Sequence, residues 1–240
     1  MAETSIFLKN NDESTSNDRV SKILEVKGVG ASWSGRLIFA LDATASRGPA
    51  WDLAKDLTAG MIREAASIGS LSLQLAYFRG GLDSPPECVA SAWTSDATRL
   101  AELMARVECR AGQTQINRVL AHAQRETLEA KVGAVAFISD ACEQPGDDLD
   151  RLVAAAVALA RLKTPVFAFQ EGREPMVEKA FRKIAEWSGG AYGRFDAGAA
   201  TQLGDLLRAV ATFAVGGVTA LEGRKDAGAR LLLGQLRRGS

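Results

Sequence analysis

The sequence is poor in the residues that build nitrogen and sulfur metal sites, and it has no excess charge of either sign. Its 240 residues include one histidine, His122, and three cysteines with no Cys-x-x-Cys spacing. This composition argues against a zinc site and against a disulfide framework. Lysine plus arginine and aspartate plus glutamate each number 29, so no overall field favours nucleic acid or an anionic membrane as a partner.

Long apolar segments are also missing. No stretch reaches the roughly 18 residues expected of a membrane-spanning helix. The first five residues are polar and acidic, without the apolar centre of a signal peptide. We therefore expect a cytoplasmic protein. Apolar residues are nevertheless abundant, at 47% of the chain, which is enough for a substantial core in one large or two small domains.

Apolar runs that alternate with helical stripes predict an α/β fold. We expect strands over residues 36–42, 71–78, 88–93, 132–138, 166–169 and 191–195. Apolar residues at helical spacing lie between them, over residues 53–65, 100–107, 116–123, 149–157, 177–184 and 203–210. Strands and helices of this length, in this alternation, predict a doubly wound, mostly parallel six-stranded sheet with helices on both faces.

The composition changes at both ends of this pattern. Residues 1–33 contain a polar run with little apolar surface to bury, and we expect this segment to be partly disordered. The α/β domain is expected over residues 34–214. Residues 215–240 include two adjacent glycines, at 216 and 217, and after them five arginine or lysine residues and a group of four leucines at 231, 232, 233 and 236. We expect this segment to be a loosely attached, basic, amphipathic tail.

The most informative segment follows the first predicted strand. Asp42 leaves a buried run, and Thr44 and Ser46 follow it at alternate positions. A loop of this kind at a strand end can direct three oxygen atoms at one point, and such oxygens suit a hard divalent cation. The same side chains could instead cap the helix that follows, so the segment alone leaves both interpretations open.

Three segments in the right order resemble the metal-ion-dependent adhesion site of von Willebrand factor A domains. The first is this Asp-x-Thr-x-Ser, which is similar to the family's Asp-x-Ser-x-Ser with Thr44 in place of the first serine. Residues 112–114, Gly-Gln-Thr, precede a predicted helix and resemble the second motif, Gly-x-Thr. Residues 138–140, Ile-Ser-Asp, end the fourth predicted strand like the third motif, although Ala141 replaces its usual glycine.

The resemblance implies a Rossmann-like sheet with strand order 3-2-1-4-5-6, in which the segment 88–93 is antiparallel at one edge. In that order the topological switch lies between the first and fourth strands, where open sheets of this class bind ligands. Asp42 ends the first of these strands and Asp140 the fourth. Two carboxylates far apart in sequence are therefore expected to meet in one crevice.

The resemblance also implies a set of metal ligands. Thr44, Ser46 and Thr114 would bind the ion directly, and Asp42 and Asp140 would support them, mostly through water. Mg²⁺ or Mn²⁺ fits a site with so few anionic ligands, because Mg²⁺ retains several of its waters in proteins. An acidic side chain of a partner protein would complete the coordination shell, and no bond would be broken.

The implied function is that of a protein-binding module of the bacterial intracellular type, and not that of an enzyme. Bacterial relatives often act beside AAA+ ATPases or in multiprotein assemblies, so such an assembly is a candidate partner. We expect neither nucleic acid nor a membrane as a partner. The sequence identifies neither the partner nor the oligomeric state.

An enzymatic alternative is the haloacid dehalogenase superfamily, which the same Asp-x-Thr-x-Ser also resembles. In such a Mg²⁺-dependent phosphatase, Asp42 would be the nucleophile and Thr114 a phosphate-binding hydroxyl. Lys131 would neutralise charge and Asp140 would bind Mg²⁺. Phosphatases of that superfamily usually have a second aspartate, the general acid, where this chain has Thr44.

Overall fold

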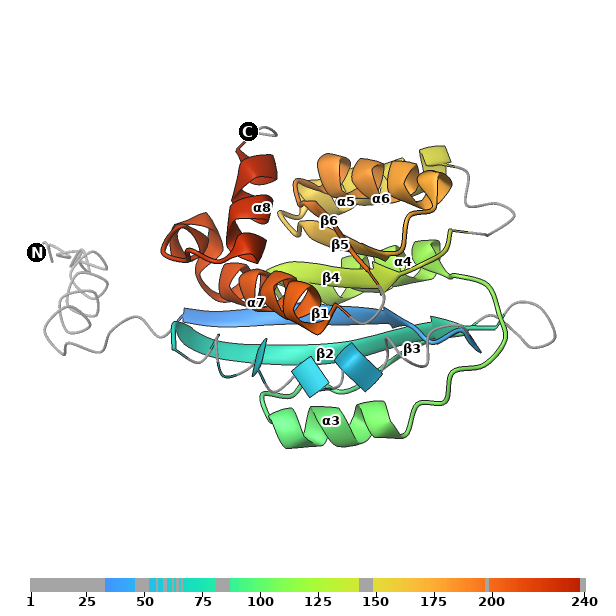
Figure 1. The fold of residues 1–240 in the computed structure, drawn as a ribbon, viewed down its shortest axis with the longest axis horizontal. Helices are drawn as coiled ribbons and strands as arrows, with labels where there is room; N and C mark the ends of the chain where they lie inside the picture. The colour runs from blue at the N-terminus through green and yellow to red at the C-terminus, as the bar shows by residue number, and fades with distance from the viewer. Residues whose placement is uncertain are drawn as a thin grey trace, which may run out of the picture. The chain divides into compact units, whose positions relative to one another are not determined.

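The computed structural model describes residues 33–237, except for residues 46–51, 55, 58–59, 62, 64, 66, 81–86, 143–148 and 197–198. The strands are β1 (Trp33–Asp42), β2 (Gly69–Arg79), β3 (Glu87–Ala90), β4 (Ala134–Ser139), β5 (Val166–Glu171) and β6 (Tyr192–Phe195) (Figure 1). The helices are α3 (Ala97–Ala105), α4 (Ile116–Glu129), α5 (Leu149–Arg161), α6 (Pro175–Ser188), α7 (Ala200–Glu222) and α8 (Ala227–Leu236). The described residues from 52 to 65 are also helical.

The strands form one six-stranded sheet in the order β3-β2-β1-β4-β5-β6, with β3 antiparallel and the others parallel. This confirms the predicted fold class and strand order. All six residues of β4 are buried, as expected for a parallel strand covered on both faces. β3 is shorter than predicted because the Leu75 N–H bonds to the Ser91 hydroxyl, at 3.1 Å, instead of to a main-chain carbonyl.

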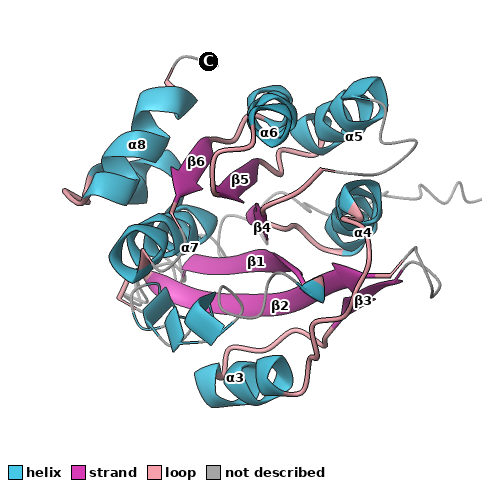
Figure 2. Ribbon diagram, turned by 45° about the vertical axis from the view of Figure 1, so that its right-hand side comes forward, coloured by secondary structure: helices cyan, strands magenta, loops and turns pink. Residues whose placement is uncertain are grey.

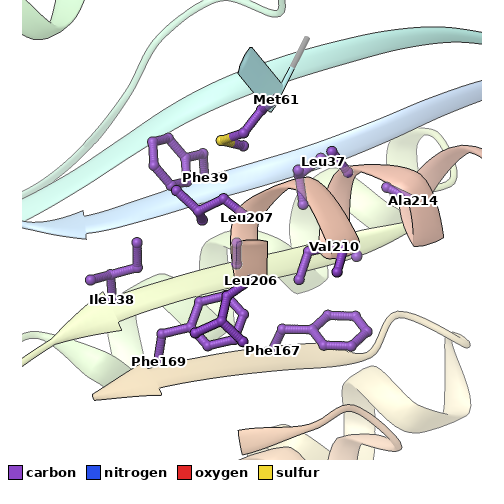
Figure 3. Close-up of a cluster of buried hydrophobic side chains, with 14 of the residues drawn as sticks. Leu37, Phe39, Met61, Ile138, Phe167, Phe169, Leu206, Leu207, Val210 and Ala214 are labelled. Carbon is purple, nitrogen blue, oxygen red and sulfur yellow. The ribbon is translucent and has the colours of Figure 1, made fainter. Parts of the chain in front are cut away.

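Helices cover both faces of the sheet (Figure 2). Leu37 and Phe39 of β1 point to the face covered by α3, α7, α8 and the helical residues from 52 to 65. Figure 3 shows Phe39 on this face with Leu207 and Val210 of α7. Ile38 alternates with them and points to the face covered by α4, α5 and α6. The sheet is therefore the middle layer between two apolar cores.

The C-terminal region corrects one prediction. The domain does not end at residue 214, because α7 continues to Glu222 with a kink at Gly217, where φ is +63°. α8 then folds back and buries Ala229 and Leu232 in the same core as α7. Leu233 and Leu236 of α8 pack against this core as well, so most of the segment 215–240 is part of the domain and not a loose tail.

α7 is the one described helix that is long and apolar enough, by length and composition, to cross a membrane. In the structure 56% of its most apolar window is buried inside the protein. Its apolar composition is thus accounted for by its position on the central strands of the sheet, which require apolar partners along their whole length.

Candidate metal-binding site

Three segments meet beyond the carboxyl ends of β1 and β4, where the strand order reverses. Leu41 of β1 pairs with Ile138 of β4, so the next residues of the two strands, Asp42 and Ser139, come side by side. The third segment is the turn before α4, which includes Thr114. The parallel pairing of β1 with β4 and the turn before α4 thus bring together residues up to 97 positions apart.

The carboxylate of Asp42, a residue that is only 1% exposed, is the centre of this arrangement. Its Oδ1 atom accepts a hydrogen bond from the Thr44 N–H at 2.8 Å. Its Oδ2 atom accepts two more, from the Ser139 hydroxyl at 2.6 Å and from the Thr114 hydroxyl at 3.2 Å. These three donors are neutral groups, and they satisfy a carboxylate that burial would otherwise destabilise.

The direction of these hydrogen bonds matters for metal binding. A threonine hydroxyl has one proton and two lone pairs. When Thr114 donates its proton to Asp42, its lone pairs remain available to accept from another donor or to bind a cation. Asp42 therefore orients a hydroxyl ligand in the way that second-shell carboxylates orient the ligands of metal sites.

Main-chain hydrogen bonds hold the loop after β1 in place. The Ala43 N–H donates to the Phe78 carbonyl of β2 at 3.0 Å, and the Ala43 carbonyl accepts from the Arg110 N–H at 3.0 Å. Thr44 forms a short parallel bridge with Arg110. The chain therefore continues in an extended path after Asp42, which holds the Thr44 residue, 7% exposed, beside the site.

Gly112 sets the position of the turn before α4. A Cβ atom at this residue would lie 2.2 Å from the main-chain nitrogen of Gly80, so no other residue fits without moving the backbone. The neighbouring Gln113 N–H donates to the Gly80 carbonyl at 2.8 Å. The glycine of the predicted Gly-x-Thr motif thus permits the close approach that brings Thr114 to Asp42.

Of the five predicted site residues, the structure brings Asp42, Thr44 and Thr114 together. Asp140 directly follows Ser139 at the carboxyl end of β4, and Ser46 lies outside the described residues. Ser139 was not predicted as a site residue, although its hydroxyl makes the shortest of the hydrogen bonds to Asp42 given above. A hydroxyl residue directly before the strand-end aspartate was the signal that could have identified it.

The donor atoms fit a hard cation. Within the described part of the chain, no three His, Cys, Asp or Glu side chains gather into a metal-binding group. An ion at this position would therefore depend on the hydroxyls of threonine together with carboxylate oxygens. Hydroxyl, carboxylate and water oxygens are the ligands that suit Mg²⁺ and Mn²⁺.

Lys131, the charge-neutralising residue of the phosphatase alternative, lies away from this site. It precedes β4, whereas Asp42 is the last residue of β1, and the two strands are parallel, so the residues lie at opposite ends of the strands. The Lys131 ammonium donates to the carbonyls of Leu162, at 2.8 Å, and Lys163. Burial lowers the pKa of Lys131, and the nearby Lys163 charge adds to this effect. The structure therefore does not assemble the predicted phosphatase site.

A second, half-buried polar cluster lies between β1, β2 and α4. The Glu126 Oε2 atom accepts from the Trp93 indole N–H at 2.7 Å and from the Arg36 guanidinium at 3.2 Å. The Arg36 guanidinium also stacks 3.8 Å above the centre of the Trp93 ring. On the same helix, the His122 Nε2 atom lies 2.8 Å from the Gln74 Oε1 atom. His122 is therefore a half-buried structural residue of α4.

The environment of this cluster shifts two pKa values. Burial lowers the pKa of His122 below its usual 6.5, and the charge of Glu126 opposes this effect only in part. For Glu126, burial raises the pKa, but the hydrogen bonds from Trp93 and Gln74 and the nearby His122 and Arg36 outweigh it. The net result is a Glu126 pKa below its usual 4.5, so this carboxyl group stays ionised.

No protein-family sequence model and no curated protein sequence matches the chain. Solved structures do match it in fold. BatB from Bacteroides thetaiotaomicron aligns with a TM-score of 0.54 and 20% identity, over 70% of this chain and 94% of BatB. A von Willebrand factor type A protein from Catenulispora acidiphila aligns at 0.55 and 16% identity, over 76% of this chain and 43% of that one.

A third similar structure is proximal thread matrix protein 1 from the mussel byssus, solved with zinc in its metal-ion-dependent adhesion site. It aligns with a TM-score of 0.55 and 15% identity, over 74% of this chain and 44% of that one. The present chain thus spans less than half of this protein and of the Catenulispora protein. At these identities the alignments show a shared fold and do not by themselves transfer a metal, a ligand or a partner.

Proposed function

We propose that this protein, which has the von Willebrand factor A fold, is a module that binds another protein through a divalent cation. The observation that supports the proposal is the buried Asp42 carboxylate, which collects hydroxyls from β4 and from the turn before α4 at the switch point of the sheet. The zinc-occupied adhesion site of the mussel protein supports a metal at the corresponding position of this fold.

In this proposal Thr44, Thr114 and Ser46 provide the hydroxyl ligands, and Asp42 and Asp140 orient them and supply negative charge. A bound Mg²⁺ or Mn²⁺ would supply an electrophilic centre for an acidic side chain of the partner. Because only two residues of the set have formal charge, the protein alone would bind the ion weakly. The partner carboxylate would therefore contribute a large part of the affinity.

Metal binding is tested by calorimetric titration of Mg²⁺ and Mn²⁺ into the wild type, the Thr114→Ala variant and a Thr44→Ala/Ser46→Ala variant. We expect one weak site in the wild type and none in the variants. Thr127→Ala is the matched control, because it also removes a buried threonine hydroxyl from the α4 region, one that bonds to Ala123 and Thr164 instead. Equal titrations for all four proteins would contradict the proposal.

Partner binding is tested by affinity capture from the source cells with the wild type and the Asp140→Ala variant, each with Mg²⁺ or with a chelator. We expect capture by the wild type in Mg²⁺ alone. Glu102→Ala, which removes an exposed acidic side chain from α3, is the control and should capture normally. Capture that persists in chelator and in Asp140→Ala would place the binding surface elsewhere.

We propose no enzymatic activity. The position of Lys131 removes one component of the phosphatase alternative, and Thr44 stands where a general acid would be needed. Mg²⁺-dependent hydrolysis of an aryl phosphate, lost in Asp42→Asn, would overturn this view. A cytoplasmic location remains a prediction, as does a AAA+ ATPase or multiprotein assembly as the partner.

A further inference from the structure

The strand β6 is at the edge of the sheet, on the side away from β3. Toward β5, the Ala191 carbonyl accepts from Ala168 and the Phe195 carbonyl accepts from Gly172, each at 3.0 Å. Main-chain groups alternate in direction along a strand. The N–H and C=O groups of Tyr192 and Arg194 therefore point away from the sheet, where a further strand would bind.

Glutamine side chains bond to these outward groups. The Tyr192 N–H donates to the Gln235 Oε1 atom at 2.9 Å, and the Tyr192 carbonyl accepts from the Gln235 Nε2 atom at 2.7 Å. The Arg194 carbonyl accepts from the Gln202 Nε2 atom at 2.7 Å. A side-chain amide offers the same donor and acceptor as a peptide group. Gln235 of α8 therefore occupies the place of one residue in an absent neighbouring strand.

A groove of about 310 Å³ lies along this edge. α8 lies beside β6 (Figure 2), and Gln235 and Leu231 of α8 contribute to the lining of the groove. Its other lining residues include Gln202 of α7, Arg182 of α6 and the whole of β6. A groove with an edge strand along one side has the geometry that extended peptides use when they add to a sheet.

The charged residues of the groove favour an acidic ligand. Its lining includes two guanidinium groups, those of Arg182 and Arg194, and one carboxylate, that of Asp196. Asp196 is engaged with Arg173, at 3.4 Å. The Arg182 guanidinium lies 4.3 Å above the centre of the Tyr192 ring, which holds it over the edge strand. Glu178 of α6 contacts the Arg182 guanidinium at 2.7 Å and the Arg194 guanidinium at 4.0 Å. With Arg173, three guanidiniums thus face two carboxylates, so the groove combines main-chain groups for an extended backbone with a net positive charge that favours an acidic side chain.

We propose that this groove binds an extended, acidic peptide segment of another protein, which adds to the edge of β6 as a further strand. The segment would take the hydrogen bonds of Tyr192 and Arg194 that Gln235 and Gln202 now make, and an acidic side chain would pair with Arg182 and Arg194. Among the described residues of the proposed metal site, none lines the groove. This second binding surface is therefore independent of the metal-dependent function.

The test uses the full chain, labelled with ¹⁵N, and a synthetic peptide of about eight residues in which valine and threonine alternate around one central glutamate. We expect saturable shifts of the Tyr192 and Arg194 amide signals, unchanged by EDTA. A peptide with N-methyl groups at alternate residues lacks the donors for strand pairing and should bind at least about ten-fold more weakly. A peptide with glutamine for glutamate should bind about three-fold more weakly.

Variants locate the binding site. Arg182→Glu should weaken binding of the glutamate peptide about ten-fold, whereas Arg99→Glu on α3 should not change it. Gln235→Ala removes the amide that competes for Tyr192 and should strengthen binding about five-fold. Circular dichroism and the melting temperature establish that each variant is folded. If Arg182→Glu does not fold, Arg182→Ala replaces it, and its binding of the glutamate peptide should be about three-fold weaker.

Several results would overturn the proposal. These are no saturable binding up to about 1 mM peptide, equal binding of the N-methylated peptide, and equal binding by Arg182→Glu. Loss of binding in EDTA would assign the peptide to the metal site instead. Sedimentation of the Gln235→Ala variant as a dimer would assign the edge to a second copy of this chain.

Discussion

Two carboxylates of this protein, the buried Asp42 and the half-buried Glu126, accept hydrogen bonds from different kinds of donor. Glu126 bonds to the guanidinium of Arg36 and to the indole of Trp93, so a cation of the chain itself balances its charge. Asp42 bonds to the Thr44 N–H and to hydroxyls, which have no charge. Both groups are hydrogen-bonded, but by donors of different chemistry.

This difference separates a structural cluster from a candidate binding site. A guanidinium and an indole are donors alone and have no lone pair to offer a ligand. A hydroxyl that donates to a carboxylate still has lone pairs for a cation. The donors to Glu126 therefore have nothing to offer a cation, whereas the hydroxyl donors to Asp42 keep lone pairs of the kind that the proposed ion requires. The kind of donor beside a buried carboxylate is thus more informative than its burial.

The largest effect is expected for Asp42→Asn, which keeps the shape of the side chain and removes its charge. At a Mg²⁺ concentration about 100 times the dissociation constant, the wild type should gain about 2.7 kcal/mol in free energy of unfolding. The variant should gain little or nothing, because the hydroxyls lose the carboxylate that orients them. Urea unfolding with and without Mg²⁺ measures this gain.

Glu126→Gln is the control and should show the same gain from Mg²⁺ as the wild type. An equal gain in Asp42→Asn would remove the distinction between the two clusters.

The second prediction concerns the structural cluster. Glu126→Ala should lower the free energy of unfolding by about 2 kcal/mol, because it leaves the Arg36 guanidinium and the Trp93 N–H without their acceptor. The stabilisation by Mg²⁺ should remain as in the wild type. Chemical unfolding curves provide both values. A loss of the Mg²⁺ response here would show that the two clusters are coupled along α4.

Ser139→Ala tests the residue that the sequence analysis did not assign to the site. We expect it to lower the free energy of unfolding by about 1 kcal/mol and to weaken Mg²⁺ binding about ten-fold, since its hydroxyl positions Asp42. Ser188→Ala is a matched control, because that buried hydroxyl bonds to the Val166 N–H and the Ala185 carbonyl. Calorimetry should show weaker Mg²⁺ binding for Ser139→Ala alone.

The smallest expected effect is the pH dependence due to His122. Its pKa in the folded protein is below 6.5, so the unfolded chain binds a proton more readily. Stability from this group is complete above pH 6.5 and is lost as the pH falls toward the pKa of the folded state. Unfolding experiments between about pH 5 and 7 should show a shallower decline for His122→Gln than for the wild type. An unchanged slope would exclude His122 as the source.

Much of the fold could be predicted from the sequence because local patterns determine its elements. The apolar run of β4 and the helical stripe of α4 both appear at their predicted positions. The end of the domain could not be predicted in this way, because the glycines at 216 and 217 suggested a stop. In the structure Gly217 produces a kink, and α8 returns to the core through Ala229 and Leu232.

By itself, the sequence determined the order of the strands and helices. It also identified three polar segments, which lie at the carboxyl end of β1, at the carboxyl end of β4 and in the turn before α4. These depend on residues that are close along the chain, so periodicity and motif spacing are sufficient to identify them. Only the tertiary structure decided that Ser139 bonds to Asp42, that Lys131 lies at the opposite end of the central strands, and that Gln235 bonds to the outer side of β6. Those contacts depend on strand register and helix packing, which bring together side chains from distant parts of the chain.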